Sequence, residues 1–221
     1  MSKKDAKKEI LEKIQHELGR SSVGIKSYDH VPRAYRRQSD KSRDEITAEF
    51  IERVNEYKAV VKKADSDTIH KILAASCKER GARKVVIPYG FPKQWLPEEI
   101  EIEVEIDKEG AWLTKQQIDD ADVAITGCAV AVAQTGTICL NAREGQGRRI
   151  LTLVPDFHIC IVRENQIVEL LPEAISQLQP DVQDDQLPIT LISGPSATSD
   201  IELSRVEGVH GPRKLTVVVM N

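Results

Sequence analysis

Aromatic residues are scarce in this sequence: three Phe, two Trp and four Tyr make up 4% of its 221 residues. A core must therefore rest on Val, Ile, Leu and Ala, and binding of nucleic acid along aromatic platforms is not expected. Cysteine is also rare, and no two cysteines have the C-x-x-C spacing of a zinc ribbon or a ferredoxin cluster. The sequence thus predicts no metal site and no cofactor of its own. The four cysteines are Cys77, Cys128, Cys139 and Cys160.

Long hydrophobic runs are absent as well. No apolar stretch reaches the ~18 residues that a membrane-spanning helix needs. No charged segment followed by an apolar stretch opens the chain in the manner of a secretory signal. We therefore expect a protein of the reducing cytoplasm with no membrane partner.

Charge is unevenly distributed along the chain. The net charge is −4, yet residues 1–43 hold twelve Lys/Arg and six Asp/Glu, a local balance of +6 that leaves −10 for the rest. A basic segment can bind nucleic acid or an acidic partner. Because this segment mixes both signs, a solvated helix with i,i+4 ion pairs is the favoured interpretation. The overall acidity and the lack of a recognition motif argue against a nucleic-acid partner.

Helical periodicity dominates the first third of the chain. An amphipathic helix is predicted over 3–18, stopped by Gly19, followed by a linker over 20–42. Further helices are predicted over 44–63 and over 66–80, the latter capped by Asp65 or Ser66 and ended by Gly81. We divide the chain into an N-terminal helical arm and linker, residues 1–43, and one domain, residues 44–221. The arm could also pack against a second protomer in a homo-oligomer.

Short apolar runs take over from residue 84. Strands are predicted over 84–88, 102–106, 122–127, 137–141, 149–154, 158–162, 188–193 and 215–220, with helices near 114–120 and 166–178. Continuous Val/Ile runs separated by helices are typical of parallel strands buried on both faces. The fold class expected is α/β: a mainly parallel sheet flanked by helices, with an N-terminal helical extension.

Three clusters of small and hydroxyl-bearing residues could bind a ligand. The segment 126–137 reads as a turn of helix between two strands, where small residues let a ligand reach the backbone; tight helix–sheet packing explains it equally well. The segment 193–202 reads as a hydroxyl-rich loop that follows a strand and enters a helix N-terminus, which favours anions; the alternative is a hydroxyl-rich turn with a helix cap. The segment 208–213 places His210 near Arg213, and a simple turn is the alternative.

We predict that these clusters share one pocket at one end of the sheet and bind a small anion, a carboxylate or a phosphate. The candidate ligand-binding residues are Thr135, Gly136, Thr137, Ser193, Gly194, Ser196, Thr198, Asp200 and His210. His158 lies in a strand pattern and is interpreted as a hydrogen-bonded core histidine. The glycine-rich stretch 141–149 lacks a following helix, so it is read as a connection between strands with its arginines on the rim.

Taken in order, the segments 133–137, 154–159, 192–196, 200–202 and 208–213 resemble the LUD-domain family, to which lactate utilisation protein C belongs. The resemblance implies a fold like that of the sugar-phosphate isomerase and CoA-transferase group. It also implies a role in a bacterial three-protein system that oxidises L-lactate to pyruvate, with iron–sulfur subunits as partners. Two positions depart from the family pattern: Gln134 stands where Glu is expected and Ala197 where Arg is expected.

A freestanding enzyme of the same fold group, acting on a phosphorylated, CoA or folate-type substrate, is the alternative. A CoA-transferase needs a nucleophilic Glu in a dry pocket. Glu144, flanked by glycine near the strand ends, is the only candidate. The sequence assigns no catalytic residue.

Overall fold

The computed structural model describes residues 3–20, 34–96, 102–198, 206–208 and 210–221. The chain forms two compact units: an N-terminal unit, Met1–Tyr35, and a main unit, Arg36–Asn221. Within the N-terminal unit, helix α1 (Lys3–Arg20) confirms the predicted amphipathic helix. Gly19 does not stop the helix, which continues to Arg20. The apolar stripe of α1 is exposed to solvent, with Ile10 58% accessible.

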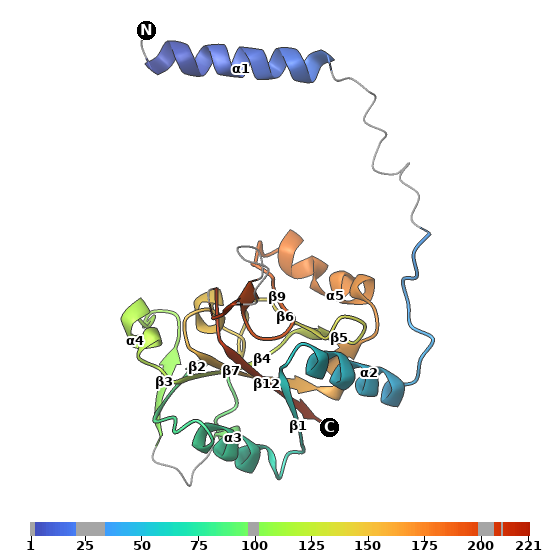
Figure 1. The fold of residues 1–221 in the computed structure, drawn as a ribbon, viewed down its shortest axis with the longest axis vertical. Coiled ribbons are helices and arrows are strands. Elements are labelled where there is room, and N and C mark those ends of the chain that lie inside the picture. The colour runs from blue at the N-terminus through green and yellow to red at the C-terminus, as the bar shows by residue number, and fades with distance from the viewer. Residues whose placement is uncertain (1–2, 21–33, 97–101, 199–205, 209) are drawn as a thin grey trace. The chain divides into compact units, whose positions relative to one another are not determined.

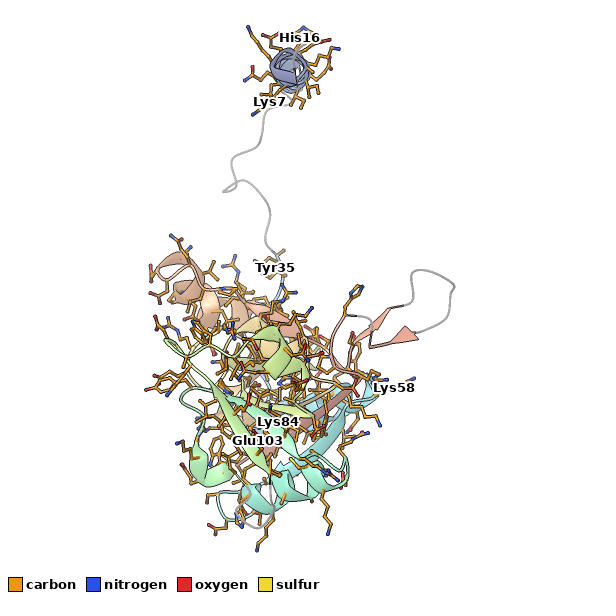
Figure 2. The ribbon with its side chains drawn as sticks, turned by 90° about the vertical axis from the view of Figure 1, so that its left-hand side faces the viewer. Lys7, His16, Tyr35, Lys58, Lys84 and Glu103 are labelled. Atoms are coloured by element: carbon orange, nitrogen blue, oxygen red, sulfur yellow. The ribbon has the colours of Figure 1, made fainter. Side chains whose placement is uncertain are left out.

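A six-stranded sheet, entirely parallel, forms the centre of the main unit (Figure 1). This confirms the α/β fold class expected from the sequence. The strands in spatial order are β1 (Val60–Ala64), β12 (Lys214–Met220), β7 (Phe157–Arg163), β4 (Val123–Gly127), β2 (Lys84–Pro88) and β3 (Glu103–Asp107). All their carboxyl ends therefore meet at one edge of the sheet and all their amino ends at the other. Lys84 and Glu103, which are register partners, mark the amino ends of two adjacent strands (Figure 2).

Both faces of this sheet are covered. Ile159 and Ile161 of β7 pack with helix α3 (Ile69–Lys78) and the 3-10 turn η2 (Lys93–Trp95) on one face. The alternating side chains of Cys160 and Val162 point to the opposite face, where α2 (Arg43–Glu56) packs. Helix α4 (Lys115–Asp119) and the 3-10 turn η3 (Arg149–Thr152) cover that same face over β2 and β4. This alternation is the period-2 pattern of a strand buried on both sides.

A second, four-stranded sheet, which the sequence did not predict, joins this second face. Its strands in spatial order are β8 (Ile167–Val168), β5 (Val130–Val132), β6 (Thr137–Leu140) and β9 (Thr190–Ile192). Helix α5 (Leu171–Gln183) packs against it through Ala174 and Leu178. The predicted turn of helix within 126–137 is wrong, because β5 and β6 form an antiparallel pair there. The predicted helix over 166–178 starts only at residue 171, after the turn η4 (Glu164–Gln166) and β8.

The helix predicted over 44–63 is correct only in its first part. Ser42 and Glu45 form a capping box at the start of α2, but the helix ends at Glu56. Lys58 adopts a left-handed φ of 65°, which turns the chain, and Val60 begins β1 opposite Thr216. The Val/Tyr spacing that suggested a continuous helix face therefore spans a helix and an edge strand.

Three smaller predictions are also corrected. The segment 149–154 is not a strand, because its first part forms η3. Helix α3 begins at Ile69 rather than at residue 66, although Asp65 caps the turn before it by accepting hydrogen bonds from the backbone N–H groups of residues 67 and 68. No helix follows β9 among the described residues, since β10 (Ala197–Thr198) pairs with β11 (Val206–Glu207). In the part of the chain that the structure describes, no helix is long and apolar enough to span a membrane.

Candidate functional site

A cavity of about 310 Å³ lies at the amino ends of β7 and β12. His158 and Leu215, which are register partners near the start of these strands, form part of its wall. We call it the amino-end cavity. The polar side chains in its wall include Arg149, Thr152, His158, Ser193, Ser196 and His210. Of the nine candidate residues predicted from the sequence, four line this cavity: Ser193, Gly194, Ser196 and His210.

Hydrogen bonds join two of the three predicted loops directly. The N–H of Ser196 donates to the carbonyl of Pro212 (2.9 Å), and the N–H of Gly208 donates to the carbonyl of Ser196 (3.0 Å). The N–H of His210 donates to Oγ of Ser196 (3.1 Å). Among the described residues this hydroxyl has no acceptor for its own proton, which is therefore available to donate to a ligand.

The third predicted loop reaches the cavity through a chain of hydroxyl groups. Oγ1 of Thr137 lies 2.7 Å from Oγ1 of Thr135 and 2.7 Å from Oγ of Ser193. Only Ser193, at the end of this chain, belongs to the wall of the amino-end cavity. Thr135 and Gln134 instead line a separate depression next to Arg53 of α2. The hydroxyl chain therefore positions Ser193. Thr135 and Thr137 lie outside the cavity wall and are linked to it only through this serine.

Gly136 and Gly194 have a packing role. Each has a left-handed φ, 56° and 77° respectively. A Cβ on Gly136 would lie 2.9 Å from backbone atoms of Arg53 and Val54, and a Cβ on Gly194 would lie 2.9 Å from the carbonyl oxygen of Tyr57. Both loops thus press against the carboxyl end of α2, which favours the close-packing interpretation at these two positions.

His158 forms the most buried polar part of the cavity wall. Its Nε2 lies 2.8 Å from Oγ1 of Thr126, and both residues are buried. Burial lowers the pKa of His158 from its ordinary 6.5 to about 4, so the imidazole is neutral at neutral pH. The prediction of a hydrogen-bonded core histidine is confirmed, and this residue also faces the cavity.

The charge of the amino-end cavity favours anions. Arg149 and His210 line it, while no carboxylate is found among the described residues of its wall. Thr152, buried beside them, donates from Oγ1 to the carbonyl of Arg149 (3.0 Å) and so braces that residue. Sequence reasoning missed Arg149 and Thr152 because the segment 149–154 was assigned to a strand; the Arg148–Arg149 pair after a glycine-rich stretch was the available signal.

Two predicted residues cannot be placed at this site. Asp200 lies outside the described residues, and of Thr198 only the backbone is described, in β10. The side chain of Ala197, one of the two departures from the family pattern, is likewise not described. Gln134, the other departure, donates from its N–H to the carbonyl of Glu169 (3.0 Å).

The cysteines are buried, and this burial affects their reactivity. All four cysteines are free and buried, and burial raises the pKa of the Cys77 and Cys139 thiols to about 11. A thiol with that pKa is almost entirely protonated at neutral pH and is a weak nucleophile. Among the described residues, no group of three or more His, Cys, Asp or Glu side chains is arranged to hold a metal ion.

Comparison with known proteins places these observations in a family. The LUD domain matches residues 41–220. Lactate utilization protein C of Deinococcus radiodurans is 43% identical over 179 residues, 81% of each chain. The Halalkalibacterium halodurans protein of the same name is 28% identical over 91% of each chain. A crystal structure of a DUF162 family protein from Deinococcus radiodurans superposes with a TM-score of 0.70 at 38% identity, covering 82% of this chain and 99% of that one. The chain belongs to the LUD-domain family.

Proposed function

We propose that this protein is a component of a lactate utilisation system. The observation that carries the proposal is the 43% identity with a lactate utilization protein C across 81% of both chains. The matched region includes nearly the whole main unit. An identity of this size over a full domain is typical of proteins that keep the same architecture and site positions.

Within that role, the protein binds a small carboxylate or phosphate in the amino-end cavity. Arg149 and His210 supply positive charge or hydrogen-bond donors, and Ser193 and Ser196 supply hydroxyl groups. A hydrogen bond to a charged group contributes about 1.5–3 kcal/mol, so two or three such donors are enough to hold a small anion. His158, neutral by virtue of its burial, can add a hydrogen bond at no cost in charge.

Electron transfer is assigned to partner subunits that carry iron–sulfur clusters, and the protein acts with them in the cytoplasm. Among the described residues, the four buried cysteines belong to no group of three or more His, Cys, Asp or Glu side chains arranged to hold a metal. A homo-oligomer remains part of the proposal, with α1 as the contacting element.

The role is tested by replacing the gene for lactate utilization protein C in Deinococcus radiodurans with one for this chain. We expect growth on L-lactate to be restored, with growth on glucose unchanged throughout. Failure to grow on L-lactate, with the protein present at normal level, would contradict the proposal.

The site is tested separately by calorimetry with L-lactate, pyruvate and inorganic phosphate. Ser196→Ala should weaken binding of the anion by about 0.5–3 kcal/mol. The matched control is Ser176→Ala on α5, whose hydroxyl donates to the carbonyl of Pro172 away from the cavity. Equal affinities for both variants would remove the amino-end cavity from consideration.

The alternative of a freestanding CoA-transferase gains no support from Glu144. This side chain is exposed rather than enclosed in a dry pocket, and it lines a different, open cavity. Assays with CoA esters would revive the alternative only if turnover depended on this residue.

A further inference from the structure

A second cavity, of about 510 Å³, lies at the opposite edge of the sheet. It adjoins Tyr89, directly after β2, and Lys108, directly after β3, so it sits at the carboxyl ends of parallel strands. Ligands of open α/β sheets bind preferentially at this edge. We call it the carboxyl-end cavity. Its lining side chains include Tyr89, Lys108, Trp112, Arg143, Glu144 and Arg148.

Two large aromatic side chains are exposed in this cavity. Tyr89 is 56% and Trp112 50% accessible, in a chain that has only nine aromatic residues. An exposed Trp loses the free energy that burial of its ring would provide, about 25 cal/mol per Å². A ligand that covers these rings would recover it.

Trp112 is held in a fixed stack. The guanidinium carbon of Arg148 lies 4.7 Å from the centre of its ring. Arg148 in turn makes two hydrogen bonds, of 2.8 and 2.5 Å, to the fully buried carboxylate of Asp107 and a third, of 3.0 Å, to the carbonyl of Leu113. A cation–π stack that is already formed presents a flat surface and needs no ordering when a flat ligand arrives.

The backbone around Tyr89 and the glycine-rich loop is also fixed by hydrogen bonds. The N–H of Gly145 donates to the carbonyl of Tyr89 (2.7 Å), and the N–H of Gly127 donates to the carbonyl of Gly145 (2.7 Å). The N–H of Tyr89 donates to the carbonyl of Asp107 (2.9 Å). The glycine-rich loop and both strand ends therefore form one connected frame around the cavity.

The charges of the cavity select the kind of ligand. Asp107 neutralises Arg148, and Asp181 and Asp185 pair with Arg143. Within the described chain no ion pair involves Lys108, Glu109 or Glu144, which leaves one cation and two carboxylates on the wall. A polyphosphate would be repelled by this balance, whereas amine and hydroxyl groups would find acceptors in the two glutamates.

We propose that the carboxyl-end cavity binds a planar nitrogen heterocycle of the nucleobase class, carried as a nucleoside rather than as a nucleotide polyphosphate. The ring stacks against Trp112 and Tyr89, and Glu109 and Glu144 accept hydrogen bonds from its amine or ribose hydroxyl groups. The proposal goes beyond the lactate role and uses none of the residues of the amino-end cavity.

Adenosine is the probe, and the fluorescence of Trp112 is the readout. The chain has two tryptophans, so Trp95→Phe in the full-length protein leaves Trp112 as the sole emitter. Trp95 packs edge-on against Phe91 on the α3 side of the sheet. Trp95→Phe is therefore also the control for the loss of a Trp that does not line this cavity. Adenosine should quench the signal saturably at concentrations up to about 1 mM, and ribose 5-phosphate should not.

Calorimetry then locates the site. Trp112→Leu and Tyr89→Leu should each weaken adenosine binding at least about fivefold, the lower range for loss of one base–aromatic stack, and ATP should bind more weakly than adenosine. Ser196→Ala should leave adenosine binding unchanged, which separates this test from that of the proposed function. The proposal is overturned if adenosine gives no saturable signal, if both Leu variants bind it normally, or if ribose 5-phosphate binds equally well.

Discussion

Thr126 and His158 are joined by a 2.8 Å contact between Oγ1 and Nε2, on the adjacent strands β4 and β7, with both side chains buried. Burial lowers the pKa of His158 to about 4, whereas the unfolded chain binds that proton near 6.5. Between these values the unfolded state holds more protons, so stability rises with pH and is lost as pH falls from about 6.5 to 4. The loss should be on the order of 3 kcal/mol at most.

Denaturant titrations from pH 7 to pH 4 measure this effect. His158→Gln can keep a hydrogen bond to Thr126 but cannot titrate, so the free energy of unfolding should fall less steeply with acid. His16→Gln on the exposed surface of α1 is the matched control and should retain the wild-type slope. An unchanged slope in His158→Gln would contradict the prediction.

Gly136→Ala should destabilise the protein strongly. The residue has a left-handed φ of 56°, and a Cβ would lie 2.9 Å from the backbone of α2. Strain and overpacking together should cost about 2–5 kcal/mol. Gly110 has a similar φ of 78° with nothing within 4 Å of a built Cβ, so Gly110→Ala should cost only about 1 kcal/mol. Thermal melts that rank the two variants equally would show that contact with α2 is unimportant.

Arg148→Ala should lower the free energy of unfolding by on the order of 3 kcal/mol, because it leaves the fully buried carboxylate of Asp107 without its partner. Arg213→Ala removes the equivalent group from an exposed pair with Asp156 and should change stability little. Chemical denaturation of both variants makes the comparison. Similar small losses for the two would mean that Asp107 is stabilised by its other contacts, such as the N–H of Leu113.

Deletion of residues 1–20 should lower the melting temperature by only a few degrees, as expected for a loss of ~1 kcal/mol or less. The deletion removes α1, which belongs to the N-terminal unit. Deletion of residues 1–42 should lower it much more, because Arg36, Ser39 and Lys41 contact the buried carboxylate of Glu169 in the main unit. Light scattering on both deletion variants checks whether α1 joins protomers, in which case the first deletion changes the oligomer size.

Five of the six strands of the central sheet were predictable, because each is a short apolar or alternating run bounded by breakers. The segments 84–88, 158–162 and 215–220 match β2, β7 and β12 to within one residue at each end. β1 was missed because Val60 and Val61 continue the spacing of α2, while their partners in β12 lie over 150 residues away. The residues around β1 therefore give no information about a strand partner so distant in the sequence.

The site was only partly predictable for a related reason. Ser193, Ser196 and His210 stood out as small or hydroxyl-bearing residues beside glycines, and the structure joins their loops. The second sheet was not foreseen, because Ala131 and Ala133 suit a tight helix as well as a buried strand. The division of the chain at residue 43 remains a prediction, as does the shared ligand site.

The adjacent residues Arg148 and Arg149 line different cavities, the first at the carboxyl edge of the sheet and the second at the amino edge. A single peptide bond thus connects the two proposed ligand sites. A ligand that displaces the backbone at this bond would alter affinity at the other site, and thermodynamic reciprocity requires the same factor in both directions. The effect of a nucleoside on anion binding would therefore reveal, without a separate measurement, the effect of the anion on nucleoside binding.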